Sequence, residues 1–476
     1  MKFILFCVHS TGLAVAIASG AALQIALLFP SLARSTFAQT LPETQADSVR
    51  VPDFLNPDPN PLQLPIQPQE VKIQRTQPIT LAEALELAKR NNRELQVAIL
   101  ELERSRSALR ESQAVLSPNI GVNTNLTKSG QDFIGSGSQT RTSFNSQAQI
   151  NYDLFNSGRS IRVAEERLRI DELDVENRTL EVRLNVTTQY YDLQEADEQV
   201  RINQSAVENA QASLRDAQAR ERAGVGTRFD VLQSQVNLAN AQQGLTNSLA
   251  QQQIARREFA SFLNLAQSVD ISAADAVQEA GVWEPTLEES IVQAFQNRPE
   301  LPQFLAQRNI SELERRQALS RLSPQFSLNG NYNIVDQFDD GQSLTDGYSV
   351  GIRASLTLFD GGAAKANAAQ SKINIAIAES QFASQRDQIR FNVEQFYAQL
   401  QSNSENIKTS TVALDQAREA LRLARLRFEA GVGTQTDVIF AENDLTRSEG
   451  NRVTAILNYN RALANLQRTV TFRSVR

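Results

Sequence analysis

Three residue types with distinctive chemistry are almost absent from this sequence. Its single cysteine, histidine and methionine are Cys7, His9 and Met1. If the first 38 residues are removed, the remaining chain contains none of the three. It then forms no disulfide and offers no thiol or imidazole for catalysis or for binding zinc or copper. We therefore expect no enzyme, no cofactor and no metal site.

Aromatic residues and excess positive charge are also scarce. Aromatic residues make up 6% of the chain, and the net charge is −7 with both signs spread along it. A nucleic-acid-binding protein would carry a basic stripe, so nucleic acid is excluded as a partner. The acidic residues are mixed with arginine, which is typical of solvated helix faces and offers no convergent set of titratable groups.

Long apolar runs are absent except near the start of the chain. Lys2 precedes the apolar stretch Leu13 to Phe29, and Thr36-Phe37-Ala38 provides small residues for cleavage. This order predicts a secretory signal peptide at residues 1–38, with a transmembrane anchor as the alternative. No later stretch approaches 18 consecutive apolar residues, so no other transmembrane helix is expected.

Proline is concentrated in one segment, where eight of the 14 prolines lie between Pro42 and Pro78. Each proline removes a backbone donor and restricts the residue before it, so the run Pro52 to Pro61 excludes a helix, and the segment 39–78 is expected to be an extended spacer. Two interpretations stay open. The segment is either a flexible arm or a strand-like arm that lies along the body or reaches the cell wall.

The rest of the chain is an internal duplication with an offset of about 206 residues. Four landmarks recur in the same order, which predicts a first repeat at 79–285 and a second at 286–476. The landmarks are Thr80-Leu81-Ala82-Glu83 with Thr286-Leu287-Glu288-Glu289, Leu116-Ser117-Pro118 with Leu322-Ser323-Pro324, Leu154-Phe155-Asn156 with Leu358-Phe359-Asp360, and Ala223–Thr227 with Ala430–Thr434.

The sequence of each repeat predicts short helices, then two strands, then a long helical hairpin. Alternating apolar and polar residues favour strands at about 119–127, 142–155, 325–334 and 347–359, which suit either a membrane or a soluble hairpin. Arg159 to Arg222 contains no proline or glycine and predicts a helix of roughly 95 Å. Apolar residues recur every seven positions, and the positions three further on include Ala196, Ala210, Ala217, Ala417 and Ala424, as in a closely packed coiled coil. The recurring apolar residues are Val186, Leu193, Val200, Val207 and Leu214, and later Val393, Leu400, Ile407, Leu414, Leu421 and Phe428.

Four membrane strands in one chain leave two open edges. A bilayer does not tolerate unsatisfied backbone groups, and a closed barrel takes about eight strands or more. If these strands span a membrane, the chain must therefore oligomerise, and three copies would supply 12 strands around a water-filled lumen.

These motifs together resemble the TolC family of outer-membrane efflux proteins, over roughly Ile79 to Val470. The motifs that carry the resemblance are duplicated and in order. They are Ile79-Thr-Leu-Ala-Glu-Ala-Leu-Glu-Leu-Ala88, the two Leu-Ser-Pro segments, Leu154-Phe-Asn-Ser-Gly158 with Leu358-Phe-Asp-Gly-Gly362, and Arg222-Ala-Gly-Val-Gly-Thr227 with Arg427-Phe-Glu-Ala-Gly-Val-Gly-Thr434.

The resemblance implies a mainly α-helical, internally duplicated, TolC-like fold with membrane β-strands. It implies a homotrimer whose 12-stranded β-barrel sits in outer-membrane lipid and continues into a long periplasmic α-helical barrel. It also implies a passive conduit from periplasm to exterior that docks a periplasmic adaptor protein and an inner-membrane pump of the ABC or RND type.

The two Ala-Gly-Val-Gly-Thr segments break and reverse the long helices. We expect all four glycines to supply permissive dihedral angles and both threonines to cap the next helix. A plain helical turn explains each copy alone, whereas the resemblance makes them the tips that dock an adaptor. The tip residues are Gly224, Val225, Gly226 and Thr227, and Gly431, Val432, Gly433 and Thr434.

The resemblance also places a periplasmic gate beside these tips, at Phe428, Asp230, Asp437 and Phe440. The two aspartates would form acidic rings in a trimer, or they are solvated residues favoured by the helix dipole. The family's aromatic position is matched by Phe428, which lacks a hydroxyl. Its arginine position falls on Gly433, and its second acidic position on Phe440. This departure implies an apolar constriction.

One competing interpretation is a soluble periplasmic coiled-coil scaffold or pump adaptor. An adaptor would need β-rich domains around its helical hairpin, which the sequence does not show, and only a channel needs the alternating strand pairs. Within the channel interpretation, multidrug efflux, lipid export, metal efflux and type I protein secretion all stay open. The lack of histidine, cysteine and methionine after residue 38 disfavours a conduit dedicated to soft metals.

Overall fold

The computed structural model describes residues 52–57, 60, 62, 64–133, 137–154, 158–338 and 344–470. All of them belong to the second of two units into which the chain divides, Val49–Arg476. The expected signal peptide at 1–38 lies outside the described residues.

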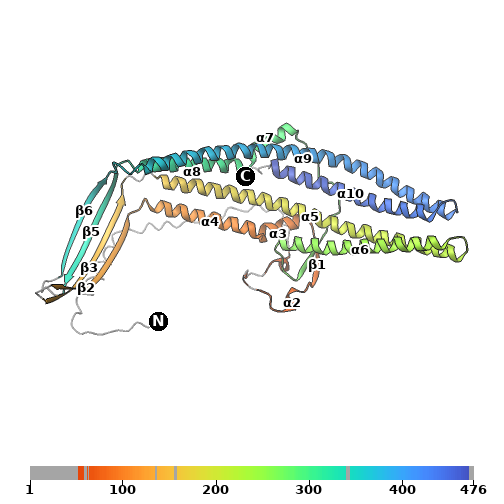
Figure 1. Cartoon of the computed structure of the whole chain (residues 1–476), viewed down its shortest axis with the longest axis horizontal. Coiled ribbons are helices and arrows are strands. Elements are labelled where there is room, and N and C mark those ends of the chain that lie inside the picture. Colours follow the sequence, from red (N-terminus) through yellow and green to blue (C-terminus); the bar gives the residue numbers. More distant parts are fainter. Residues whose placement is uncertain are drawn as a thin grey trace. The chain divides into compact units, whose positions relative to one another are not determined.

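The elements repeat in order, as the duplication predicts (Figure 1). The first repeat contains α3 (Leu81–Asn91), α4 (Arg93–Ala114), β2 (Asn119–Phe133), β3 (Gly137–Asp153), α5 (Arg159–Arg222) and α6 (Arg228–Phe262). The second contains α7 (Leu287–Asn297), α8 (Glu300–Ser320), β5 (Gln325–Gln337), β6 (Thr345–Ser355), α9 (Ala363–Glu429) and α10 (Gln435–Val470). The fold is mainly helical and internally duplicated, as expected.

The helices begin where capping chemistry places them. Thr80 accepts a hydrogen bond from the backbone N–H of Glu83, whose carboxylate accepts one from the Thr80 N–H at 2.8 Å. Thr286 and Glu289 repeat this capping box at the start of α7. Two otherwise unsatisfied backbone donors are thereby used at each helix start, so the same short motif defines the beginning of both repeats.

The long helices form two antiparallel hairpins, α5 with α6 and α9 with α10. Figure 1 shows the hairpins side by side, and α10 packs against α5. The heptad positions of α9 form its buried stripe: Val393, Leu400, Ile407, Leu414 and Leu421. The stripe packs against α10, which gives the second hairpin its core.

A four-stranded antiparallel sheet connects the short helices to the long ones, in the order β2-β3-β5-β6. Its strands differ in length from the expected ones. Strand β2 runs to Phe133 rather than 127, and β3 begins at Gly137 rather than 142. Backbone pairing continues through this polar stretch because a ladder does not require apolar side chains. Strand β5 runs to Gln337 rather than 334, while β6 starts at Thr345 and ends at Ser355 rather than 359.

The described part of the proline-rich segment is structured against the body. It contains a short 3-10 turn, η1 (Asp53–Leu55), a one-turn helix, α2 (Pro68–Val71), and strand β1 (Arg75–Ile79). Strand β1 pairs in parallel with β4 (Val269–Ala273), a strand that follows α6 and was also not predicted. Alternation in five residues is too short to stand out from the polar residues around it.

The segment is also held by its side chains. Leu55 is completely buried in the cluster that includes Leu87, Tyr190 and Phe259, and its carbonyl accepts a hydrogen bond from the Ala266 N–H at 3.3 Å. Of the two interpretations of the segment, an arm that lies along the body is the one seen.

Residues 274–286 join the two repeats, and this segment lies alongside α10. Asn460 in α10 donates to the Gln278 carbonyl and accepts from the Ala280 N–H, both at 2.8 Å. Trp283 packs on the cluster of α7, α9 and α10, and its indole N–H donates to Ser290 Oγ at 3.0 Å.

No helix within the described ranges is long and apolar enough to cross a membrane.

Candidate functional site

The two hairpin tips have the same backbone geometry. Gly224 and Gly431 follow the last helical turn with φ of 74° and 78°. In the first tip the N–H of Val225 donates to the Arg220 carbonyl, and in the second the N–H of Val432 donates to the Arg427 carbonyl, both at 3.0 Å. This is the Schellman pattern, which satisfies the last carbonyls of a helix and needs a left-handed residue.

The second glycine of each tip has a different role from the one expected. Gly226 and Gly433 do not have positive φ, so the expectation of a permissive dihedral angle is wrong for these two. A Cβ at Gly226 would lie 3.0 Å from Arg220 Cβ, and one at Gly433 would lie 3.0 Å from the backbone nitrogen of Phe428. These glycines are required because the returning chain passes against the preceding helix.

Both tip threonines cap the next helix, as the sequence predicts. Asp230 Oδ2 accepts from the Thr227 hydroxyl at 2.7 Å and from its N–H at 3.1 Å. Asp437 Oδ2 accepts from the Thr434 N–H at 3.0 Å, and Thr434 Oγ1 accepts from the Asp437 N–H at 3.1 Å. The backbone hydrogen bond from Thr434 lowers the pKa of the Asp437 carboxyl from its ordinary value. Each aspartate therefore acts as a cap within its own chain.

The candidate gate aromatics lie in different environments. Phe428 is half-buried near the end of α9, packed on the cluster of Leu421 and Val438. The guanidinium of Arg220 lies 4.4 Å from the centre of the Phe428 ring and donates to the Phe428 carbonyl at 2.6 Å. Phe440 in α10 is exposed. One chain therefore does not bring the four gate residues together: Phe428 contacts α5, each aspartate bonds to its own turn, and Phe440 faces outward.

A polar network above the tips joins the hairpins and was not predicted from the sequence. Glu442 is 4% exposed, and its Oε1 accepts from Ser213 Oγ at 2.6 Å and from Arg425 at 3.1 Å. Arg425 also donates to Asn209 Oδ1 at 2.9 Å. Three helices, α5, α9 and α10, are thereby linked. One signal was available, since Glu442 interrupts an otherwise apolar stripe in α10.

The outermost residues of the tips are apolar and exposed. Val225 and Val432 are each about 70% exposed. In a Schellman turn the residue at this position often packs against the preceding helix. Neither valine is buried by such a contact. Two small apolar caps are thus presented at the ends of the hairpins.

The sheet has one apolar face, which is exposed. Register aligns Leu126 with Phe144, and Tyr332 with both Ala148 and Tyr348. Apolar side chains on this face are more than half exposed at Ile120, Val122, Leu126, Tyr348, Val350 and Ile352. Such a patch on a protein surface marks contact with lipid or with another protein.

The opposite face of the sheet is built from carboxamides and small residues. Register aligns Asn151 with Asn329, and Gln147 with Asn333. Asn329 donates to Asn151 Oδ1 at 2.7 Å, and Gln147 donates to Asn331 Oδ1 at 3.2 Å. The two faces together match a wall with lipid on one side and water on the other.

No group of three or more histidine, cysteine, aspartate or glutamate residues that could hold a metal ion occurs in the part of the chain that the structure describes.

The chain matches a family model described as outer membrane efflux protein, over residues 84–265 and 290–470. These two segments fall within the two repeats of the sequence. Among curated proteins, it is similar to the outer membrane protein TolC of Vibrio cholerae, with 28% identity over 193 residues, or 37% of this chain and 43% of TolC. The aligned part thus spans less than half of that relative.

A second relative aligns over more of its length. The cobalt-zinc-cadmium resistance protein CzcC of Cupriavidus metallidurans is 24% identical over 391 residues, which is 80% of this chain and 86% of CzcC. Among solved structures, that of CusC, described in connection with transmembrane channel formation, has a TM-score of 0.73 at 17% identity. It covers 87% of this chain and 99% of CusC.

Proposed function

Because this chain belongs to the outer membrane efflux protein family, we propose that three copies of it form the outer-membrane channel of a tripartite efflux or type I secretion system. The channel is a passive conduit from the periplasm to the exterior. The observation that carries the proposal is the four-stranded sheet with an exposed apolar face and two unpaired edges.

The edges of the sheet support closure with other copies. Strands β2 and β6 lie at the two edges, and every neighbouring pair is antiparallel, so β6 of one copy runs antiparallel to β2 of the next. With 11 to 17 residues, each strand is long enough to cross a bilayer when tilted. Since two copies make only the smallest barrel and three leave a water-filled lumen, a 12-stranded barrel fits a conduit.

The long helices support a tube that continues the barrel. Apolar side chains remain exposed along α6 and α9 after each hairpin has packed, including Val236, Ile373, Ile377 and Phe391. Helices of 64 and 67 residues would extend this tube roughly 100 Å from the barrel. The repeats at 79–285 and 286–476 then each supply two strands and one hairpin, after a signal peptide at 1–38 and an arm at 39–78.

The tips are the proposed docking surface for a periplasmic adaptor. The adaptor would connect the channel to an inner-membrane pump of the ABC or RND type. The exposed valines Val225 and Val432 would enter the adaptor interface. Replacing both with aspartate should abolish co-purification with the adaptor while leaving the channel intact. Unchanged co-purification would contradict this docking site.

The proposed gate lies just inside the tips, where Asp230 and Asp437 would form rings and Phe440 an apolar constriction. Asp230→Asn with Asp437→Asn should reduce cation selectivity, and Phe440→Ala should raise single-channel conductance. Val412→Ala, at an exposed apolar position of α9 away from the tips, is the control. A Phe440→Ala channel that conducts like the wild type would rule out the constriction.

The function is tested by the mass of the purified full chain in detergent, measured by light scattering, and then by conductance in planar bilayers. We expect a three-chain particle that needs detergent and conducts. A particle that is soluble without detergent and does not conduct would contradict the channel and favour the soluble scaffold.

A further inference from the structure

Positive charge is concentrated at the helix ends that adjoin the four-stranded sheet. We define the collar as the twelve residues nearest the sheet in α4, α5, α8 and α9. It contains eleven arginines and lysines and six acidic residues, although acidic residues outnumber basic ones 54 to 47 in the whole chain. The twelve residues nearest the tips in α5, α6, α9 and α10 contain eight of each sign. The excess of positive charge therefore belongs to the end next to the sheet.

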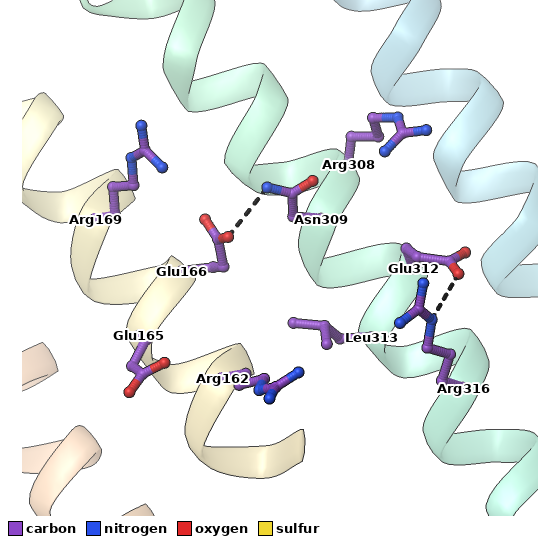
Figure 2. A pocket seen from close by; sticks show the side chains of 9 residues that line it. All are labelled: Arg162, Glu165, Glu166, Arg169, Arg308, Asn309, Glu312, Leu313 and Arg316. Atoms are coloured by element: carbon purple, nitrogen blue, oxygen red, sulfur yellow. Dashed lines mark hydrogen bonds and ion pairs between the residues drawn. The ribbon is translucent and has the colours of Figure 1, made fainter. Parts of the chain in front are cut away.

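A groove in this collar separates α5 from α8 (Figure 2). Its volume is about 550 Å³, and its floor includes Leu313. Arg162 lies in the first turn of α5, and Arg316 lies in the last turns of α8, so both are within two helical turns of the linkers to the sheet. Figure 2 shows Arg162 extending from α5 toward α8, and the guanidinium group of Arg316 beside Glu312 of its own helix.

The acidic residues of the groove are largely committed to other partners. Glu312 accepts from Arg315 and Arg316 at 2.8 Å, and these hydrogen bonds lower its pKa to about 2. Glu166 accepts from Asn309 at 3.0 Å. Glu165 extends away from α8 in Figure 2. Glu312 is therefore neutralised within the chain, whereas Glu166 Oε2 lies buried without a hydrogen-bond partner among the described residues. Four arginines line the groove against three glutamates, so its lining keeps an excess of positive charge.

The arginines of α5 differ from those of α8. Arg308 pairs with Glu379 of α9 at 3.0 Å. Across the described ranges, neither Arg162 nor Arg169 forms an ion pair. They are separated by seven residues, which places them on the same helix face about 10.5 Å apart. Two cations without acidic partners therefore face a groove whose opposite wall carries two more arginines, Arg308 and Arg316, each paired with a glutamate. An anion in the groove would neutralise the two unpaired ones.

We propose that this groove binds the phosphate group of an anionic phospholipid in the periplasmic leaflet of the outer membrane. Arginine suits phosphate because its planar donors bind two oxygens at once. The proposal rests on the proposed function, since the sheet next to the collar must span the bilayer to place the collar at the headgroups. Phe326, on the apolar face of β5, lies ten residues beyond Arg316, so a lipid bound in the groove can extend its chains along that face.

The site is tested by native mass spectrometry of the full-chain trimer released from detergent, titrated with dioleoylphosphatidylglycerol or dioleoylphosphatidylcholine. We expect three tighter sites for phosphatidylglycerol, one per chain, and weaker binding of phosphatidylcholine. A cation near the headgroups strengthens binding roughly five-fold, so Arg162→Gln with Arg169→Gln should weaken these sites about 25-fold. Equal binding of the two lipids, or of wild type and variant, would overturn the proposal.

Arg201→Gln is the matched control. Arg201 lies on the same helix, 39 residues and roughly 58 Å from Arg162, and pairs with Glu198 at 2.7 Å. Its loss should leave lipid binding unchanged, and a loss of binding as large as that of the groove variant would overturn the assignment to the groove.

Two further outcomes exclude other anions. If inorganic phosphate displaces phosphatidylglycerol at equal concentration, the groove is a free-anion site. If the groove variant dissociates into single chains, the arginines bind a neighbouring subunit. Either result overturns the lipid assignment. A wild type that forms no detergent-dependent trimer or does not conduct contradicts the proposed function instead, whereas a conducting trimer without lipid preference contradicts only this inference.

Discussion

At the scale of single residues, the two glycines of each tip motif are needed for two different physical reasons. Gly431 is needed for its positive φ, whereas Gly433 is needed for space beside the backbone of Phe428. Threonine and aspartate then complete a cap, so almost every side chain and backbone group of the Gly-Val-Gly-Thr motif is used within its own chain. The exposed valine is the exception, which is why it is the residue available to a partner.

Replacing Gly433 with alanine should destabilise the second hairpin by about 1 to 3 kcal/mol, because the new Cβ meets backbone that cannot move away. The measurement is the thermal midpoint of helix loss by circular dichroism. Gly450→Ala in α10 is the control, since its Cβ would lie 3.8 Å from Gln199 Oε1, an ordinary contact. It should stabilise the helix by roughly 0.5 to 1 kcal/mol. A Gly433→Ala chain as stable as the wild type would contradict the steric explanation.

The cap at Asp437 should make stability depend on pH. Its pKa lies below the ordinary 3.8 in the folded chain, so its contribution is complete above 3.8 and is lost as pH falls through the lower, folded value. The wild type should therefore melt at a higher temperature than Asp437→Asn at pH 7, and the difference should vanish in strong acid. A difference that persists there would show that the charge is not its source.

The sequence predicted part of this site. The turn and the caps at the tips depend on glycine, threonine and aspartate residues that are close together in the sequence, so they could be predicted. The contact of Arg220 with Phe428, and the network around Glu442, join helices more than 200 residues apart in the chain. No local pattern specifies which arginine reaches which partner across that separation.

At the scale of elements, one long helix was predicted to the residue while the short strands β1 and β4 were missed. The helix from Arg159 to Arg222 is a stretch without proline or glycine between two glycine turns. Strands β1 and β4 have five residues each, and they exist because they pair with each other and with the core beneath them. The prolines correctly excluded a long helix from the arm but could not indicate that Leu55 is buried.

Leu55→Ala should therefore destabilise the protein although it lies among prolines. Removing a fully buried leucine leaves a cavity, with an expected loss of about 2 to 5 kcal/mol. Leu62→Ala, seven residues later and 88% exposed, is the matched control and should have little effect. The two thermal midpoints decide between an arm that is part of the core and one that only lies on it, and equal midpoints would contradict the former.

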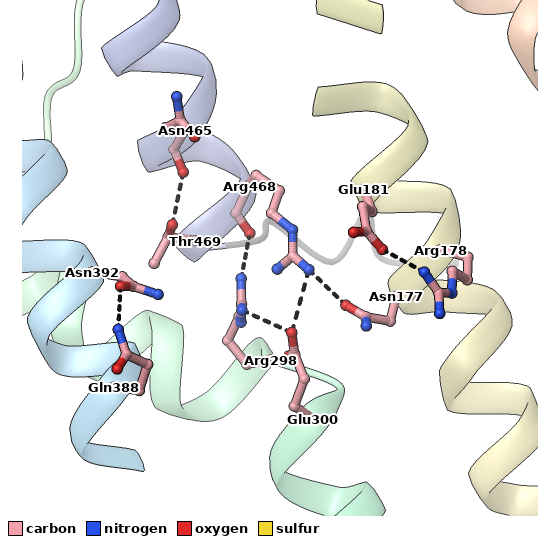
Figure 3. Close-up of polar contacts among 10 residues, drawn as sticks. All are labelled: Asn177, Arg178, Glu181, Arg298, Glu300, Gln388, Asn392, Asn465, Arg468 and Thr469. Atoms are coloured by element: carbon pink, nitrogen blue, oxygen red, sulfur yellow. Dashed lines mark hydrogen bonds and ion pairs between the residues drawn. The ribbon is translucent and has the colours of Figure 1, made fainter. Parts of the chain in front are cut away.

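At the scale of the whole described unit, the repeats are fastened together by a buried charge network (Figure 3). Glu300 at the start of α8 accepts from Arg298 at 2.7 Å and from Arg468 of α10 at 3.3 Å. Arg468 also donates to Asn177 of α5 at 2.6 Å, so one carboxylate holds together helices of both repeats. All three charged side chains are less than 15% exposed.

Glu300→Gln should be strongly destabilising, because it leaves two buried guanidinium groups without their shared carboxylate. The expected cost is about 3 to 5 kcal/mol, seen as a lower thermal midpoint. Glu405→Gln breaks an exposed pair with Lys408 and should change the midpoint little. Similar midpoints for the two variants would show that the network is not needed to hold the repeats together.

The parallel pair of β1 and β4 has a consequence for the order in which the molecule is made. Arg75 pairs with Val269, so β1 is synthesised 194 residues before its partner. At 5 to 20 residues per second, that interval is about 10 to 40 s. During it the first helical hairpin can form from local contacts, whereas β1 and the core cluster around Leu55 cannot close. The arm near the start of the chain is therefore among the last parts of the first repeat to fold.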